Sequence, residues 1–237
     1  MDIFAANKLV NIHGIVFDLD GTLIDTLPDI LSALNSVMTG EGFRKISLHE
    51  ARKLVGGGAQ NLIEEAFATV GESKTNPNIS LAFEKFLKFY EKKATAKSTL
   101  FSDAENFLDT AYKNGFKLGI CTNKPIGLTK IILKEMKLTH YFGDAVIGGD
   151  SLSVRKPNAV HLHETIKVMG TAMKNTVMVG DSETDVKAAR NAGVPVILVD
   201  FGYSNLPPNR LGADAIISSF AELPSALITI NETKMCY

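Results

Sequence analysis

Two carboxylates two residues apart at the end of a short apolar run are the strongest chemical signal in the sequence. Asp18 and Asp20 follow residues 13–17 and precede Gly21 and Thr22. Aspartate is unfavourable in a strand and costly to bury without a partner. Because residues two apart in an extended segment point the same way, both side chains can face one point above a sheet, where a metal ion would relieve their repulsion. A bare pair of this kind is common by chance, but the apolar run before it and the glycine after it favour a functional site.

A second acidic group follows the apolar run 175–180, where the sequence reads GDSETD. Asp181 ends that run and Asp185 follows four residues later. Two acidic strand ends suggest one site for a hard cation, and Mg²⁺ typically takes one or two carboxylates together with a substrate phosphate. The alternative is a helix cap in which Asp181 or Ser182 accepts backbone N–H bonds. Both interpretations can hold at once.

Two further segments carry groups that can hold phosphate oxygens. Thr122 and Asn123 offer a hydroxyl, a carboxamide and backbone N–H groups just before a predicted helix, as a phosphate site requires. Lys156, in the tripeptide RKP, can reach a phosphoryl oxygen. Taken singly, these are an ordinary cap and a surface lysine. Together, four strand ends that carry acid, hydroxyl with amide, lysine and acid describe a phosphoryl-transfer site.

The elements that must position these residues alternate between short apolar runs and helical patterns. This alternation is typical of a parallel sheet with crossover helices, and the expected fold class is α/β. The predicted strands are 13–19, 116–122, 144–149, 175–181, 195–200 and 214–218. The predicted helices that accompany them are 127–136, 159–169, 182–191 and 221–229.

One long interval interrupts this alternation with four amphipathic stretches and no convincing strand. These stretches are 28–38, 47–55, 61–70 and 79–92. They predict an inserted helical domain at 25–98, within a core formed by 1–24 and 99–237. Since the insertion leaves after the first strand and returns before the second, it should lie over the carboxyl ends of the strands, where open α/β sheets bind ligands.

Composition excludes several classes of protein. The 237 residues are 45% hydrophobic and 22% charged, which excludes a disordered, collagenous or coiled-coil chain. The formal net charge of -1 provides no general attraction to nucleic acid or to an anionic membrane. The two cysteines are too few for a disulfide scaffold or a cysteine-ligated metal. With no secretion signal at the N-terminus and no long apolar run, we expect a cytoplasmic protein.

The segments FDLDGTLIDT, CTNK, RKP and VGDSETD resemble the four motifs of the haloacid dehalogenase-like superfamily of phosphatases. The resemblance spans roughly residues 13–200 and implies a Rossmann-like three-layer core with a small α-helical cap. The segments LVGGGAQNLIEEAF, GGDSLSVRKP and VGDSETDVKAARNAGVP are more narrowly similar to the members that hydrolyse 2-phosphoglycolate. One departure is Asn158-Ala159 after Lys156-Pro157, where many relatives carry a second proline. It affects only the start of a helix.

The resemblance also implies roles for individual residues. Asp18 would be the nucleophile that forms an aspartyl-phosphate, and Asp20 the acid that protonates the leaving group and later the base that activates water. The cofactor would be Mg²⁺, held by the carboxylates of Asp18 and Asp181 and the backbone carbonyl of Asp20, with Asp185 supporting the site. The phosphoryl oxygens would be held by Thr122, Asn123 and Lys156.

Candidate residues in the cap are Thr26, where the chain leaves the core, and Gly57 and Gly58. Thr26 is a candidate hinge. The glycines would let the backbone approach a small ligand closely, although a plain flexible turn is equally consistent with them. We expect His161 and His163, two apart on a predicted helix, to face different sides and hold no metal, and Cys121 to be part of the core.

Other functions remain open from the sequence. A receiver-type phosphoacceptor module shares the acidic pocket, but such modules are about half this length and lack both the inserted helices and the second aspartate. A pyrophosphatase, a nucleotidase or a sugar phosphomutase of the same superfamily fits the core motifs equally well. We expect a small phosphorylated carboxylic acid or sugar as substrate, no nucleic acid or membrane partner, and a monomer or small homo-oligomer.

Overall fold

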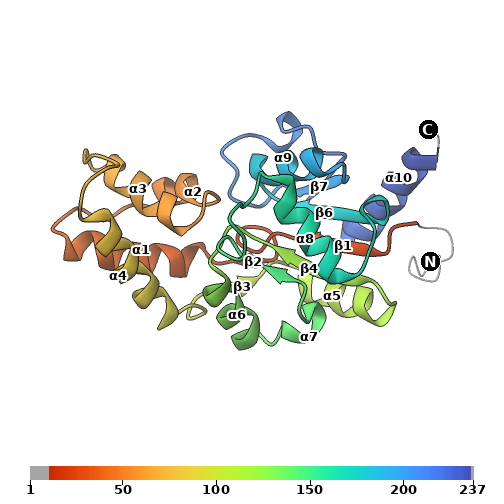
Figure 1. Cartoon of the computed structure of the whole chain (residues 1–237), viewed down its shortest axis with the longest axis horizontal. Coiled ribbons are helices and arrows are strands. Elements are labelled where there is room, and N and C mark those ends of the chain that lie inside the picture. Colours follow the sequence, from red (N-terminus) through yellow and green to blue (C-terminus); the bar gives the residue numbers. More distant parts are fainter. Residues whose placement is uncertain (1–10, 236–237) are drawn as a thin grey trace.

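A six-stranded parallel sheet forms the centre of the larger part of the molecule (Figure 1). The computed structural model describes residues 11–235, so the N-terminal segment and Cys236 lie outside the described residues. The strand order is β5-β4-β1-β6-β7-β8. The bounds are Gly14–Phe17 for β1, Lys117–Cys121 for β4, Val146–Ile147 for β5, Thr176–Gly180 for β6, Val196–Val199 for β7 and Ala215–Ile217 for β8. All six predicted strands are therefore present.

The central strands are apolar throughout because helices cover the sheet on both faces. Along β1, Ile15 and Phe17 belong to the core on one face, whereas Val16 belongs to the core on the other. Phe17 packs edge-on against Phe107 and Phe142. The alternation of a strand thus fills both layers, and the expected three-layer α/β fold is confirmed.

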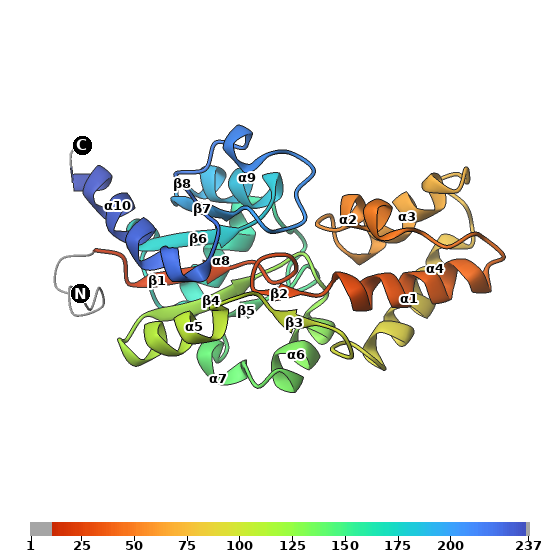
Figure 2. The same ribbon diagram turned by 180° about the vertical axis from the view of Figure 1, so that it is seen from behind.

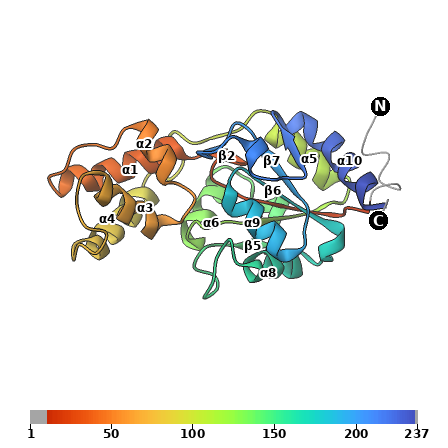
Figure 3. The same cartoon turned by 90° about the horizontal axis from the view of Figure 1, so that it is seen from above.

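The helices of this part divide between the two faces. The pair α8 and α9 lies on one face, and α5 and α10 lie on the other (Figure 3). Their bounds are Ala104–Lys113 for α5, Ile126–Glu135 for α6, Thr139–Phe142 for α7, Ala159–Met169 for α8, Glu183–Ala192 for α9 and Leu223–Met235 for α10. The sequence did not predict α5 and α7. The reason is that α7 is a single turn and α5 buries only a narrow apolar stripe.

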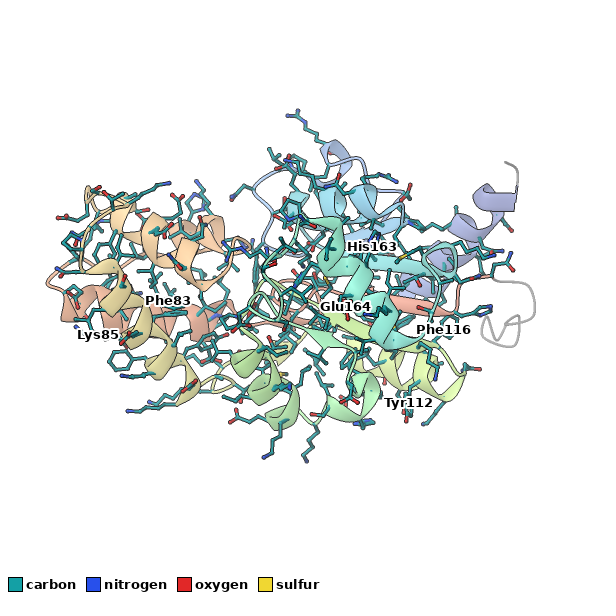
Figure 4. All side chains as sticks on the ribbon, in the orientation of Figure 1. Phe83, Lys85, Tyr112, Phe116, His163 and Glu164 are labelled. Carbon is teal, nitrogen blue, oxygen red and sulfur yellow. The ribbon has the colours of Figure 1, made fainter. Side chains whose placement is uncertain are left out.

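Four helices inserted between Asp25 and Thr99 extend beyond the carboxyl ends of the strands (Figure 2). They are α1 (Leu27–Gly40), α2 (Leu48–Leu54), α3 (Ala59–Thr69) and α4 (Ile79–Glu91). Pro28 lies in the first turn of α1, and Ser47 with Glu50 forms a capping box at α2. Figure 4 labels Lys85 on α4, whose ammonium pairs with Glu41 at 2.6 Å just after α1. The expected helical insertion is present at the expected edge, and the division at 25–98 stays a prediction.

Two adjacent linkers join the insertion to the sheet. The short strands β2 (Ile24–Asp25) and β3 (Thr99–Leu100) pair antiparallel. The buried carboxylate of Asp29 then accepts the backbone N–H of Lys97 at 2.9 Å and of Ser98 at 2.8 Å. The entering and leaving chains are therefore fixed to each other. Among the described residues, no helix has both the length and the apolar character needed to cross a membrane.

Candidate active site

The carboxylates of Asp18, Asp181 and Asp185 meet at the carboxyl edge of the sheet. Asp18 follows β1, Asp181 follows β6, and Asp185 lies in the first turn of α9. One oxygen of each lies within 4.8 Å of the others, and all three side chains are buried. Gly21 permits this approach, since a Cβ there would lie 2.5 Å from Asp181 Oδ2 and its φ is +82°. Asp18 lies more than 160 positions before the other two in the sequence, and the parallel sheet brings it next to them.

The two oxygens of Asp185 have different partners. Oδ2 accepts the backbone N–H of Asp181 and Ser182 and the Ser182 hydroxyl, at 3.2, 3.1 and 2.7 Å. Oδ1 accepts from the Lys156 ammonium at 2.7 Å. The helix-cap interpretation, which named Asp181 or Ser182, is right for Ser182, which forms a capping box with Asp185 at the start of α9. The Asp181 carboxylate instead accepts the backbone N–H of Tyr203 at 2.6 Å.

Lys156 is a buried cation placed among these carboxylates. Its Nζ lies 3.0 Å from Asp18 Oδ1 and its side chain is 2% exposed. Burial alone would lower the pKa of Lys156, but the attraction of Asp18 and Asp185 raises it above its ordinary value. The lysine therefore stays charged and partly offsets the three acids.

The acids remain in excess, and the pKa values of Asp18 and Asp181 reflect this. Burial raises the pKa of Asp18 to about 6, opposed by Lys156 and reinforced by Asp185 and Asp20. Burial, with Asp185 and Asp18, also raises the pKa of Asp181. Asp18 Oδ1 makes no hydrogen bond of good geometry to any described residue. A donor set of carboxylate oxygens with excess negative charge fits Mg²⁺, which Asp18 and Asp181 would hold with Asp185 in support.

We expect Mg²⁺ to raise the melting temperature, and to raise it more at about pH 7.5 than at about pH 5. In the metal-free fold the pKa of Asp18 is about 6, above its ordinary value of 3.8. Protonation of Asp18 stabilises the fold fully below pH 3.8, and this stabilisation is lost as the pH rises through about 6. Mg²⁺ can take the place of this proton only above about pH 6, where the Asp18 carboxylate is ionised. Thermal unfolding with Mg²⁺ and with EDTA at both pH values measures this, and equal shifts would contradict it.

Asp20 lies beside this cluster and is held by residues of the linker and the second motif. The Thr26 hydroxyl donates to Asp20 Oδ1 at 2.5 Å, so the expected hinge residue contacts the second aspartate directly. The Lys124 ammonium lies 2.9 and 3.1 Å from the two oxygens of Asp20. Sequence reasoning gave no role to Lys124, although its place directly after Thr122 and Asn123 was a signal.

Thr122 and Asn123 are buried at the end of β4. The Asn123 amide donates to the backbone oxygens of Gly56 and Lys156, both at 3.1 Å. Its Oδ1 makes no hydrogen bond to a described residue. The Asn123 side chain therefore joins the cap loop to the segment of the third motif, and its role toward phosphate stays a prediction.

A cavity lies between the insertion and the sheet edge. Asp18, Asp20 and Gly58 contribute to its wall, and Gly57 lines a neighbouring hollow that also touches Asp181. Gly58 has φ +91°, and a Cβ there would lie 3.1 Å from the backbone oxygen of Asn123. The glycine loop therefore lies against the core as a close backbone contact.

Two residues without an expected role in chemistry are part of the core. His161 is buried, with Nε2 2.9 Å from Gly148 O and Nδ1 3.3 Å from Cys121 Sγ. Burial raises the pKa of the Cys121 thiol to about 12, so it is no nucleophile. Figure 4 places His163 on α8, and its Nε2 lies 3.4 Å from Ala192 O.

Comparison with known proteins gives consistent matches over nearly the whole chain. The model of the family described as haloacid dehalogenase-like hydrolase matches residues 15–199. The phosphoglycolate phosphatase of Caulobacter vibrioides is 38% identical over 216 residues, which cover 91% of each chain. That of Agrobacterium fabrum is also 38% identical, over 90% of this chain and 91% of its own. A crystal structure titled as a predicted phosphoglycolate phosphatase from Haemophilus somnus superposes with a TM-score of 0.84 at 27% identity, covering 92% of this chain and 98% of the other.

Proposed function

The chain belongs to the haloacid dehalogenase-like hydrolases, and from this premise we propose that it is a Mg²⁺-dependent phosphatase that hydrolyses 2-phosphoglycolate to glycolate and phosphate. The family and the relatives make it a phosphoric monoester hydrolase. The substrate is the one named in relatives that match nine tenths of the chain. The observation that carries the chemistry is the buried group of Asp18, Asp181, Asp185 and Lys156 beside Asp20.

Asp18 acts as the nucleophile in this proposal. One of its oxygens attacks phosphorus in line, so that a bond from carboxylate oxygen to phosphorus forms as the ester bond breaks. Lys156, 3.0 Å from Asp18 Oδ1, holds that carboxylate in place. Water then attacks phosphorus, the aspartyl-phosphate bond breaks, and phosphate leaves with Asp18 regenerated.

Asp20 transfers protons in the two halves of the reaction. It gives its proton to the departing alkoxide oxygen and later takes one from the attacking water. Thr26 and Lys124 orient its carboxylate through the contacts at 2.5, 2.9 and 3.1 Å. Asp20 and Asp18 line the same cavity, so one substrate can meet both.

Charge explains why cations are required. Two unit charges 4 Å apart repel by about 4 kcal/mol at an effective dielectric constant near 20, and a phosphomonoester brings nearly two charges towards Asp18. When bound by Asp18 and Asp181, with the backbone carbonyl of Asp20 as the further ligand, Mg²⁺ supplies positive charge to the phosphoryl oxygens. Lys156 supplies the fixed positive charge of the chain itself, and Thr122 and Asn123 are the polar groups proposed to hold the remaining phosphoryl oxygens.

The inserted helices serve as a cap that excludes bulk water from the aspartyl-phosphate. Gly58 at the start of α3 and Tyr90 on α4 line the cavity opposite the carboxylates. Thr26 lies where the chain enters the cap and contacts Asp20, so a movement of the cap and the orientation of Asp20 are connected.

Phosphate release from a panel of phosphomonoesters with Mg²⁺ tests the proposal. We expect kcat/KM for 2-phosphoglycolate to exceed that for sugar phosphates, nucleoside monophosphates and pyrophosphate by about 10²-fold or more. Full chelation of divalent metal should abolish turnover. A preference for another ester would overturn the substrate, and activity that survives chelation would overturn the role of Mg²⁺.

The remaining expectations stay predictions. They are a cytoplasmic location, no nucleic-acid or membrane partner, and a monomer or small homo-oligomer.

A further inference from the structure

We propose that Lys124 recognises the carboxylate of the substrate and thereby makes the site selective for phosphorylated acids with a short carbon chain. This inference rests on the proposed function and deepens it, because it names the group that distinguishes 2-phosphoglycolate from other phosphomonoesters. It is carried by the position of Lys124 between the cavity, Asp20 and the cap.

The cavity offers one cation to an incoming anion. Of the described residues that line it, Lys124 is the sole lysine or arginine. Much of the rest of the wall is apolar and is formed by Ile30, Val55, Leu62, Phe86 and Leu128. A carboxylate placed against those side chains would lose its hydration without gaining a partner, which is costly. The Lys124 ammonium therefore favours the orientation in which the carboxylate of the substrate points towards it.

Nearby cations are used elsewhere. Lys156 is bound to Asp18 and Asp185, so it belongs to the phosphoryl end of the site. Arg155 is exposed, and its guanidinium lies against the outside of the loop at Gly58, where it lines a surface hollow with Asn158 and Asn191 and does not line the cavity. Lys124 is thus the one of these three that faces the space where the leaving group must lie.

The contacts of Lys124 leave it able to donate a hydrogen bond to a second carboxylate. Its Nζ contacts both oxygens of Asp20, at 2.9 and 3.1 Å, and the Tyr90 hydroxyl at 2.8 Å. An ammonium has three N–H donors, so two are directed at one carboxylate and one at Tyr90. One of the first two can turn to the substrate while Asp20 keeps the other. The Tyr90 ring, whose centroid lies 4.4 Å from Nζ, holds the charge from the cap side.

The length of the substrate matches this position. In 2-phosphoglycolate, the ester oxygen that Asp20 protonates is separated from the carboxylate by one methylene carbon. In a bound molecule, the carboxylate is therefore only one methylene group away from the ester oxygen that Asp20 protonates. Because Lys124 Nζ is 2.9 Å from Asp20, the same place is within its reach. An acid with a longer chain would carry its charge past Lys124 towards the apolar wall.

The test compares two substrates of the same shape in the Lys124→Met variant. The substrates are 2-phosphoglycolate and 2-phosphoglycolamide, in which a neutral amide replaces the carboxylate. We expect the variant to lose about 10²-fold to 10³-fold in kcat/KM for the acid, since a buried charge pair loses one partner. The loss for the amide should be about tenfold or less. The matched control is Tyr90→Phe, which removes a contact of the same ammonium without its charge and should affect both substrates equally.

Two results would overturn the inference, each in a different way. Equal losses for the two substrates would leave the preference for the acid unchanged. Lys124 would then be a positioning residue for Asp20 only, and other groups, such as the first N–H groups of α3, would bind the carboxylate. A wild-type enzyme that hydrolyses other esters but not 2-phosphoglycolate would overturn the proposed function itself, before any variant is made. If Lys124→Met does not fold, as thermal unfolding will report, Lys124→Gln replaces it.

Discussion

Replacing Asp18 by asparagine is expected to reduce kcat for 2-phosphoglycolate by about 10⁴-fold or more. The carboxamide has nearly the shape of the carboxylate, but it is a poor nucleophile and carries no charge to hold a cation. The variant should still fold, because Asp18 is one of three crowded acids and its burial already raises its pKa to about 6. Initial rates of phosphate release with saturating Mg²⁺ measure the effect.

Asp109→Asn is the control for this substitution. Asp109 lies on the surface of α5, where it pairs with Lys113 at 2.6 Å, far from the sheet edge that carries the site. Its variant should keep the wild-type rate. An Asp18→Asn protein that retains more than about a tenth of the wild-type kcat would exclude Asp18 as the nucleophile.

Replacing Lys156 by methionine is expected to lower the free energy of unfolding by about 3–5 kcal/mol in the absence of metal. The substitution leaves Asp18 and Asp185 buried without the ammonium that lies 3.0 and 2.7 Å from them. Breaking a buried pair from one side leaves an uncompensated charge, and here two acids lose the same partner. Urea unfolding with EDTA measures the loss.

Mg²⁺ should reduce this loss, because it supplies positive charge to the same carboxylates. Lys113→Met, which breaks the exposed pair with Asp109, is the control and should leave the urea midpoint unchanged. A Lys156→Met protein as stable as the wild type in EDTA would show that the three acids do not depend on this lysine.

The sheet could be predicted from the sequence because its strands are buried on both faces. Such strands are continuous apolar runs, and the polar residues that end them are conspicuous. Asp18, Thr122, Lys156 and Asp181 were found in this way, since each follows a run. The side-by-side arrangement of these ends needed only the rule that parallel strands present their carboxyl ends at one edge.

The contacts of Lys124 with Asp20 and Tyr90 could not be predicted in the same way. Lys124 lies 104 positions from Asp20 and 34 positions from Tyr90 along the sequence. Tyr90 belongs to an amphipathic helix, where an aromatic residue is expected to pack in the cap. Tyr203, whose N–H binds Asp181 and whose hydroxyl donates to Asp25 at 2.6 Å, follows the last buried central strand without any polar pattern. These contacts depend on how the cap and the loops pack against the core, and the local sequence pattern carries no information about that packing.

The pairing of β2 with β3 makes the helical insertion a unit that can be replaced without changing the core. The chain leaves the sheet at Ile24–Asp25 and returns at Thr99–Leu100, and these two segments are hydrogen-bonded neighbours. Any insertion at this place must therefore join two points that are only one strand spacing apart. The entropic cost of closing such a loop grows slowly with the length of the insertion. Different insertions can occupy this place without rerouting a strand. The helical cap and the phosphoryl chemistry of the core can thus be inherited, or exchanged by engineering, as separate parts.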